Sequence, residues 1–125
     1  MTKILVTGGA GYIGSHACKL LKSKGYTPVV YDNLCTGWQD AVKFGPFEQG
    51  DLRDGARLAE VFGKYEPAAV MHFAALSQVG ESMHNPGIYW DNNVGGSQSL
   101  MQAAVDAGCQ NFVFSSTCAT YGDQD

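Results

Sequence analysis

The chain has 125 residues and a mass of 13.4 kDa, and 45% of its residues are hydrophobic, which is typical of one globular domain. Its net charge is −4, and all eight lysines and arginines lie at or before Lys64, so we predict no basic surface for nucleic acid. No apolar run approaches the ~18 residues of a membrane span, nor the shorter core of a secretory signal, and we therefore expect a cytoplasmic protein.

Strand and helix patterns alternate from the amino terminus onward. Lys3–Thr7 is a short continuous apolar run, as in a strand that is buried on both faces. Residues 12–24 carry apolar side chains at helical spacing and end before a glycine. The stripe predicted to face the core of this helix is Ile13, Ala17, Leu20 and Leu21. The β-branched run at 27–31 predicts a second strand, with Asp32 at its carboxyl end.

The next elements are shorter. A brief strand is expected near Phe47–Gln49, followed by a helix that Asp54 caps and that runs to about Lys64. Leu58, Val61 and Phe62 are spaced to form its inner face. Residues 68–73 then predict a fourth strand.

A long helix is predicted after the fourth strand. Asn85 is placed as its N-cap and Pro86 at its first position, and the helix is expected to run to Ala107 before a glycine. Residues 111–115 predict a fifth strand. Strands that alternate with helices predict an α/β fold with a doubly wound parallel sheet in the order 3-2-1-4-5, in which the chain ends after the fifth strand.

Glycines are concentrated between the first strand and the first helix. Two registers fit a dinucleotide-binding loop: Gly9, Gly11 and Gly14 form G-x-G-x-x-G, while Gly8, Gly11 and Gly14 form G-x-x-G-x-x-G. Such glycines allow a tight turn, close approach of a pyrophosphate and close packing of helix on strand. The helix amino end offers free N–H groups to phosphates. The predicted contacts here are Gly8, Gly11, Tyr12, Ile13 and Gly14.

An acidic residue follows at the position that this type of site needs. Asp32 lies 18 residues after Gly14, at the end of the second strand. A carboxylate there accepts hydrogen bonds from both ribose hydroxyls and repels a 2′-phosphate, which favours NAD over NADP. The alternative is a solvated aspartate in a turn beside a structural glycine loop.

Further cofactor contacts are expected at the ends of the third and fourth strands. Asp51 is placed to bond the adenine amino group, with the alternative that Asp51 or Asp54 caps the next helix. Small residues after the fourth strand would let a cofactor lie against the backbone, although core packing alone also explains them. The predicted contacts in these two segments and beside Asp32 are Asn33, Leu52, Phe73, Ala74 and Ala75.

No metal site is predicted. The four cysteines include no Cys-x-x-Cys pair and have no histidine at zinc-ligand spacing. Buried free thiols are the better interpretation. The three histidines match no required role and are interpreted as packed or solvated side chains.

Seven segments together resemble the extended short-chain dehydrogenase/reductase superfamily and, within it, its epimerase-like group. They are TGGAGYIGSH (7–16), VYDNL (30–34), GDLRD (50–54), MHFAA (71–75), VGES (79–82), DNNVGG (91–96) and FSSTCATYGD (114–123). The first segment is typical of the superfamily, and DNL, VGES and NNV narrow it to the epimerase-like group.

The resemblance implies a tightly held NAD that takes hydride from C4 of a UDP-hexose and returns it to the other face. Thr117 falls on the catalytic hydroxyl position, Asn92 on the asparagine near the nicotinamide-side ribose, and Ser115 among the cofactor contacts. Ser77 is a departure, because the family often has a cofactor-binding lysine there. The resemblance also implies a homodimer through the long helix.

The family's Tyr-x-x-x-Lys pair is absent, because none of the six tyrosines is followed four residues later by lysine. We therefore expect residues 1–125 to be a partial NAD-binding domain, an inactive amino-terminal fragment without the UDP-sugar segments. An uncovered sheet edge then predicts self-association. The alternatives are a nucleotide-sugar 4,6-dehydratase, which resembles this chain less because Cys118 follows Thr117, and a non-catalytic dinucleotide-binding module.

Overall fold

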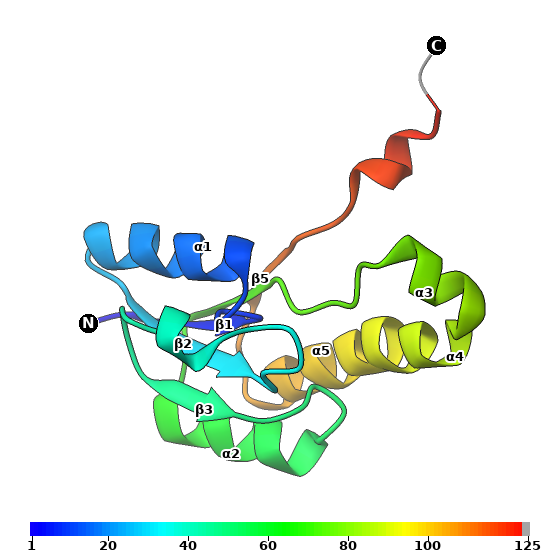
Figure 1. Ribbon diagram of the computed structural model, residues 1–125. Coiled ribbons are helices and arrows are strands. Elements are labelled where there is room, and N and C mark those ends of the chain that lie inside the picture. The colour runs from blue at the N-terminus through cyan, green and yellow to red at the C-terminus, as the bar shows by residue number, and fades with distance from the viewer. Residues whose placement is uncertain (124–125) are drawn as a thin grey trace.

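The computed structural model describes residues 1–123, which form one five-stranded parallel sheet flanked by helices (Figure 1). The strand order is β3-β2-β1-β4-β5, so the predicted doubly wound order is confirmed. All four strand pairs are parallel. The strands are β1 (Lys3–Thr7), β2 (Thr27–Asp32), β3 (Phe47–Gln49), β4 (Ala69–His72) and β5 (Asn111–Phe114).

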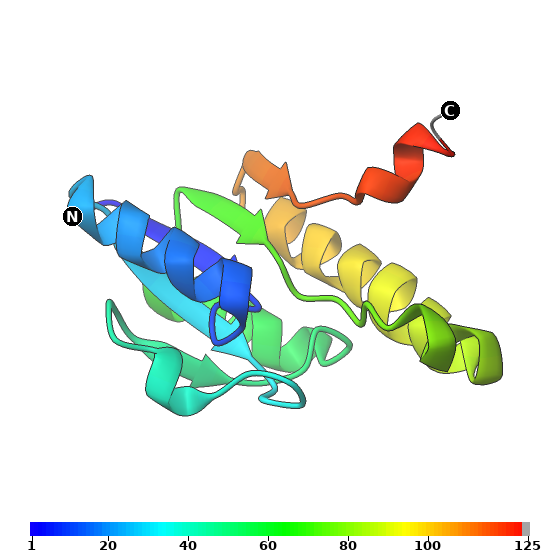
Figure 2. The same cartoon turned by 45° about the horizontal axis from the view of Figure 1, so that its top comes forward.

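The sheet separates two hydrophobic clusters because successive side chains of a strand point to opposite faces. In β1, Leu5 belongs to one cluster, while Ile4 and Val6 belong to the other. Helices α2 (Gly55–Tyr65) and α5 (Gly96–Asp106) cover the first face, and α1 (Tyr12–Ser23) covers the second (Figures 1 and 2). The continuous apolar run of β1 is therefore explained by burial on both sides.

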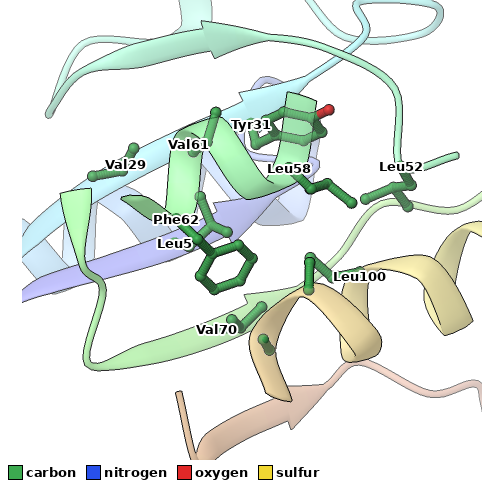
Figure 3. Packing of buried hydrophobic residues seen from close by; sticks show 11 residues of the cluster. Leu5, Val29, Tyr31, Leu52, Leu58, Val61, Phe62, Val70 and Leu100 are labelled. Carbon is green, nitrogen blue, oxygen red and sulfur yellow. The ribbon is translucent and has the colours of Figure 1, made fainter. Parts of the chain in front are cut away.

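The larger cluster lies between the sheet and the pair α2 and α5 (Figure 3). Leu58, Val61 and Phe62 of α2 are buried there, as predicted from their spacing. The Asp54 carboxylate accepts a hydrogen bond from the Arg57 amide at 3.0 Å, which confirms Asp54 as the cap of α2.

The predicted inner stripe of α1 is wrong at two positions. Ile13 and Leu20 are 58% and 60% exposed, and Gly14 and Cys18 are the buried residues of this helix. The rotation follows from Gly14, whose missing Cβ would overlap the carbonyl oxygen of Gly8. Since Gly14 must face the glycine loop, Cys18 and Leu21, which lie one and two turns further on that side, pack on the sheet.

The helix predicted from Pro86 to Ala107 is divided in the structure. It consists of α4 (Pro86–Tyr89), the π-helical turn η2 (Trp90–Gly95) and α5, with Pro86 in the first turn as expected, and a further short helix, α3 (Val79–His84), precedes it. Asn85 is the N-cap residue of α4, as predicted, although its side chain makes no capping hydrogen bond. From α4 to α5 the backbone stays helical, and its path widens at η2.

Two short 3-10 turns complete the described residues, η1 (Gln39–Ala41) and η3 (Cys118–Tyr121). The segment after β5 leads away from the sheet in both views (Figures 1 and 2). Among residues 1–123, no helix has the length and apolar character needed to cross a membrane.

Candidate functional site

A cleft of about 220 Å³ lies at the carboxyl ends of β1, β2 and β4. In a doubly wound sheet this is the switch point, where neighbouring crossovers leave the sheet in opposite directions and ligands bind. Twelve of the predicted site residues line it, and these are Gly8, Gly11, Tyr12, Ile13, Gly14, Asp32, Asn33, Leu52, Phe73, Ala74, Ala75 and Asn92.

The glycine loop forms one wall of this cleft. Gly8 has a φ of +71°, and a Cβ on it would lie 2.7 Å from the Ala74 backbone nitrogen, so only glycine fits between the two strand ends. Gly11 and Gly14 also line the cleft, whereas Gly9 packs over the side chain of Val30. Of the two registers, the one whose glycines all line the cleft is G-x-x-G-x-x-G.

The first turn of α1 lies at the cleft. No side chain caps this helix, and its first turn holds no acidic residue. The first amides of an α-helix have no intrahelical acceptor, and the helix dipole adds partial positive charge there. No lysine or arginine is among the described residues that line the cleft. A phosphate here would therefore be held by backbone amides.

Asp32 is held rigidly at the end of β2. Its side chain is buried, one carboxylate oxygen accepts from the Ala10 amide at 3.0 Å, and the other accepts from the Leu34 amide at 2.8 Å. The second bond stabilises Leu34 in the left-handed region, at a φ of +62°. A carboxylate has about four acceptor sites. Asp32 thus keeps acceptor capacity toward the cleft that it lines.

Asp51 is engaged elsewhere. Its carboxylate accepts from Arg53 Nε at 2.8 Å, from Arg53 Nη2 at 2.9 Å and from Asn33 Nδ2 at 3.3 Å. The hydrogen bonds from Arg53 lower the pKa of Asp51 well below its usual value. The cleft is lined by its neighbours Gly50 and Leu52 and not by Asp51, whose adenine contact stays a prediction.

The opposite wall consists of residues 73–76 and Asn92. Asn92 Nδ2 donates to Asn93 Oδ1 at 3.0 Å. Asn93 in turn bonds the main chain of Leu76 in both directions, donating to its carbonyl and accepting from its amide, each at 2.8 Å. Hydrogen bonds of Asn93 in η2 therefore hold this wall at Leu76.

Ser115 and Thr117 do not line the cleft and are exposed. The Ser115 amide donates to the His72 carbonyl at 3.1 Å, which extends the pairing of β4 with β5. Thr117 is the N-cap of η3, where its hydroxyl accepts from the Ala119 amide at 3.1 Å. This contact leaves the hydroxyl proton free to be donated, and the catalytic role of Thr117 stays a prediction.

Six cleft residues were missed from the sequence. They are Tyr31, Cys35, Thr36, Gly37, Gly50 and Leu76. The loop after Asp32 reaches the cleft because the Trp38 amide donates to the Ala10 carbonyl at 3.0 Å, a pairing that no local pattern indicates. The sequence could have indicated Tyr31, because it directly precedes Asp32, the residue predicted to bond the ribose. Its hydroxyl donates to the Asp51 carbonyl at 2.7 Å, and burial raises its pKa.

Within residues 1–123, no group of three or more His, Cys, Asp or Glu side chains is placed to hold a metal ion, and the four cysteines are free. Cys18 is buried, and burial raises the pKa of its thiol to about 11. Cys35 and Cys118 are exposed, so burial was the wrong expectation for these two.

The parallel sheet, the glycine loop at its switch point and the acid at the end of β2 define a Rossmann-type α/β protein. The NAD dependent epimerase/dehydratase family matches residues 4–125, and the chain belongs to that family.

The chain is also similar to individual members of the family. It is 57% identical over 122 residues to a UDP-glucose 4-epimerase of Rhizobium meliloti (strain 1021), an alignment of 98% of this chain and 37% of the relative. The crystal structure of UDP-glucose 4-epimerase from Brucella ovis in complex with NAD superposes with a TM-score of 0.96, at 56% identity. That match covers all of this chain and 38% of the other. The chain thus spans little more than a third of these relatives.

A second solved structure has a different ligand set. UDP-glucose-4-epimerase from Stenotrophomonas maltophila, with bound NAD and formylated UDP-arabinopyranose, matches with a TM-score of 0.95 and 44% identity. The match covers all of this chain and 40% of that one. Both solved relatives therefore share the fold described above in its entirety.

Proposed function

We propose that this chain is the NAD-binding part of a UDP-glucose 4-epimerase, an enzyme that interconverts UDP-glucose and UDP-galactose. The observation that carries the proposal is the cleft in which Asp32 faces the uncapped amino end of α1 across the glycine loop. The relatives described as UDP-glucose 4-epimerases, two of them in complex with NAD, support the same assignment.

The residues of the cleft fit such a cofactor. Gly8, Gly11 and Gly14, which have no side chain, line the cleft beside the first turn of α1. The amides of the Gly8 to Gly14 loop are suited to the pyrophosphate, and Asp32 to the hydroxyls of the adenosine ribose. Gly50, Leu52 and Asn33 would border the adenine, whereas residues 73–76 and Asn92 would border the other nucleotide.

The charge of the cleft favours NAD over NADP. Asp32 is its acidic side chain, and no basic side chain among the described residues lines it to neutralise a 2′-phosphate. A phosphate beside the buried Asp32 carboxylate would place two anions together in a site of low dielectric. The expected preference for NAD over NADP thus comes from Asp32 at the end of β2.

The reaction itself needs a group that accepts and returns hydride, which the nicotinamide of NAD supplies when bound. This chain contributes the binding site and Thr117, a hydroxyl able to bond the sugar oxygen as its proton leaves. Residues 1–125 contain no tyrosine with lysine four positions later, the pair that the family resemblance assigns to proton transfer. We therefore propose that the 125-residue chain alone does not interconvert the two sugars.

We further propose that the chain is cytoplasmic and associates with itself or forms a homodimer. Val113 and Phe114 of the edge strand β5 are 53% and 58% exposed, so apolar side chains are uncovered on both faces of this edge, which supports association. Sedimentation over a range of concentrations tests this, and a strictly monomeric profile would contradict it.

Calorimetric titration with NAD tests the cofactor assignment. Asp32→Ala should weaken NAD binding by tenfold or more, because a ribose loses a charged acceptor of two hydrogen bonds. Asp40→Ala, at an exposed aspartate of η1, is the matched control and should bind as the parent chain does. Equal affinity of the Asp32 variant for NAD would remove the assignment.

A further inference from the structure

His72 lies between the two walls of the cleft without lining it. This residue ends β4 and is 2% exposed. Both of its ring nitrogens have hydroxyl partners: Nδ1 lies 2.6 Å from Thr7 Oγ1, and Nε2 lies 2.8 Å from Ser97 Oγ. Thr7 directly precedes the glycine loop, and Ser97 belongs to α5. One imidazole thus joins the end of β1 to the helix beyond β4.

The direction of these hydrogen bonds follows from the contact between Ser97 and Asn93. The Ser97 hydroxyl donates to the Asn93 carbonyl at 2.5 Å, so its oxygen is left to accept the Nε2 proton of His72. A neutral imidazole that donates from Nε2 accepts at Nδ1, and the Thr7 hydroxyl therefore donates to it. Burial lowers the pKa of His72 to about 4, which agrees with a neutral ring.

The same series of hydrogen bonds continues into the cleft wall. Asn93, whose carbonyl accepts from Ser97, bonds the Leu76 amide and carbonyl with its side chain, each at 2.8 Å. Leu76 lines the cleft, and so does Asn92, the neighbour of Asn93. The hydrogen bonds therefore run without interruption from the residue before Gly8 to the wall that faces it.

Asn93 lies in the π-helical turn η2, where the backbone hydrogen bonds are spaced more widely than in an α-helix. A serine hydroxyl can bond the carbonyl four residues before it in a helix. Ser97, four residues after Asn93, bonds the Asn93 carbonyl in this way. The break in the regular helix thus coincides with the point where the helix is tied to the sheet.

We propose that His72 is a positioning residue that sets the separation of the two cleft walls through Thr7 on one side and Ser97 and Asn93 on the other. The inference rests on the proposed function, in that the ligand whose fit depends on this separation is the dinucleotide. His72 does not touch that ligand. Its effect is carried by the placement of Gly8 and of Leu76.

Ser97 offers the sharpest test, because it can be changed without opening the core beneath His72. Ser97→Ala removes the acceptor of His72 and the donor to Asn93, and it should weaken NAD binding about tenfold, as expected when one hydrogen bond no longer holds the wall. Ser97→Thr keeps the hydroxyl and should restore the parent affinity. Val61→Ala, in the core under α2 and away from the cleft, controls for lost stability.

Amide hydrogen exchange separates this inference from the cofactor assignment. Without NAD, the Leu76 amide should exchange about tenfold faster in Ser97→Ala than in the parent chain and Ser97→Thr, while Val61→Ala leaves its exchange relative to the core strands unchanged. If the parent chain fails to bind NAD, the proposed function is wrong, and exchange still decides the inference. If the Leu76 amide exchanges at the parent rate in Ser97→Ala, His72 does not position the wall. When the parent chain binds NAD, an equal NAD affinity of Ser97→Ala has the same consequence.

Discussion

Lowering the pH from 6.5 toward 4 should destabilise the fold through His72. Burial lowers the pKa of this ring from 6.5 to about 4. Between these values the unfolded chain binds a proton that the folded chain excludes, so stability is complete above pH 6.5 and declines as the pH falls toward 4. At 1.36 kcal/mol per pKa unit, the full loss is about 3 kcal/mol, a large part of the stability of a small domain.

Urea unfolding at pH 7.5, 6.5, 5.5 and 4.5 measures this loss. The free energy of unfolding should fall with a slope that approaches 1.4 kcal/mol per pH unit below pH 6. His72→Gln should remove that slope, and His16→Gln, at an exposed histidine, should retain it. Stability independent of pH between 6.5 and 4.5, or a slope that persists in His72→Gln, would refute the assignment of a neutral, buried imidazole.

Three other changes have expected outcomes. Glu48→Gln should lower the free energy of unfolding in urea by about 1–3 kcal/mol and remove an acid transition below pH 4.5. Lys64, Tyr65 and Arg57 donate to the Glu48 carboxylate and hold its pKa at about 2. An unchanged free energy of unfolding would contradict this expectation. Asp54→Ala removes the cap of α2 and should lower the free energy of unfolding in urea by about 1 kcal/mol, whereas Asp54→Asn should retain most of the stability that the cap provides. Gly8→Ala should cost at least about 1–2 kcal/mol from its positive φ alone and weaken NAD binding, and an affinity like the parent's would contradict the close approach to Ala74.

Sequence patterns predicted the sheet well because each strand carries its own signal. The apolar runs of β1 and β2 and the cap at Asp54 are local features, and the strand order follows from the alternation of strands and helices. The glycine loop and Asp32 were predicted for the same reason, since their spacing is fixed by one strand, one helix and the next strand.

The errors occurred where contacts between segments, and not the local hydrophobic pattern, decide the outcome. The rotation of α1 depends on the fit of Gly14 against Gly8, which outweighs the apolar character of Ile13 and Leu20. The π-helical turn contains Asn93, which bonds Leu76 across 17 residues of sequence, and no local pattern indicates that contact. His72 was interpreted as a packed or solvated histidine, and no sequence pattern indicated its two hydroxyl partners.

The central claim is that the cleft at the switch point binds NAD through Asp32. Titration of the parent chain and of Asp32→Ala with NAD and with NADP, in one calorimetric series, tests it most directly. The account predicts that the parent chain binds NAD and prefers it to NADP, and that Asp32→Ala loses both affinity for NAD and this preference. No binding by the parent chain, or a preference unchanged in the variant, would contradict it.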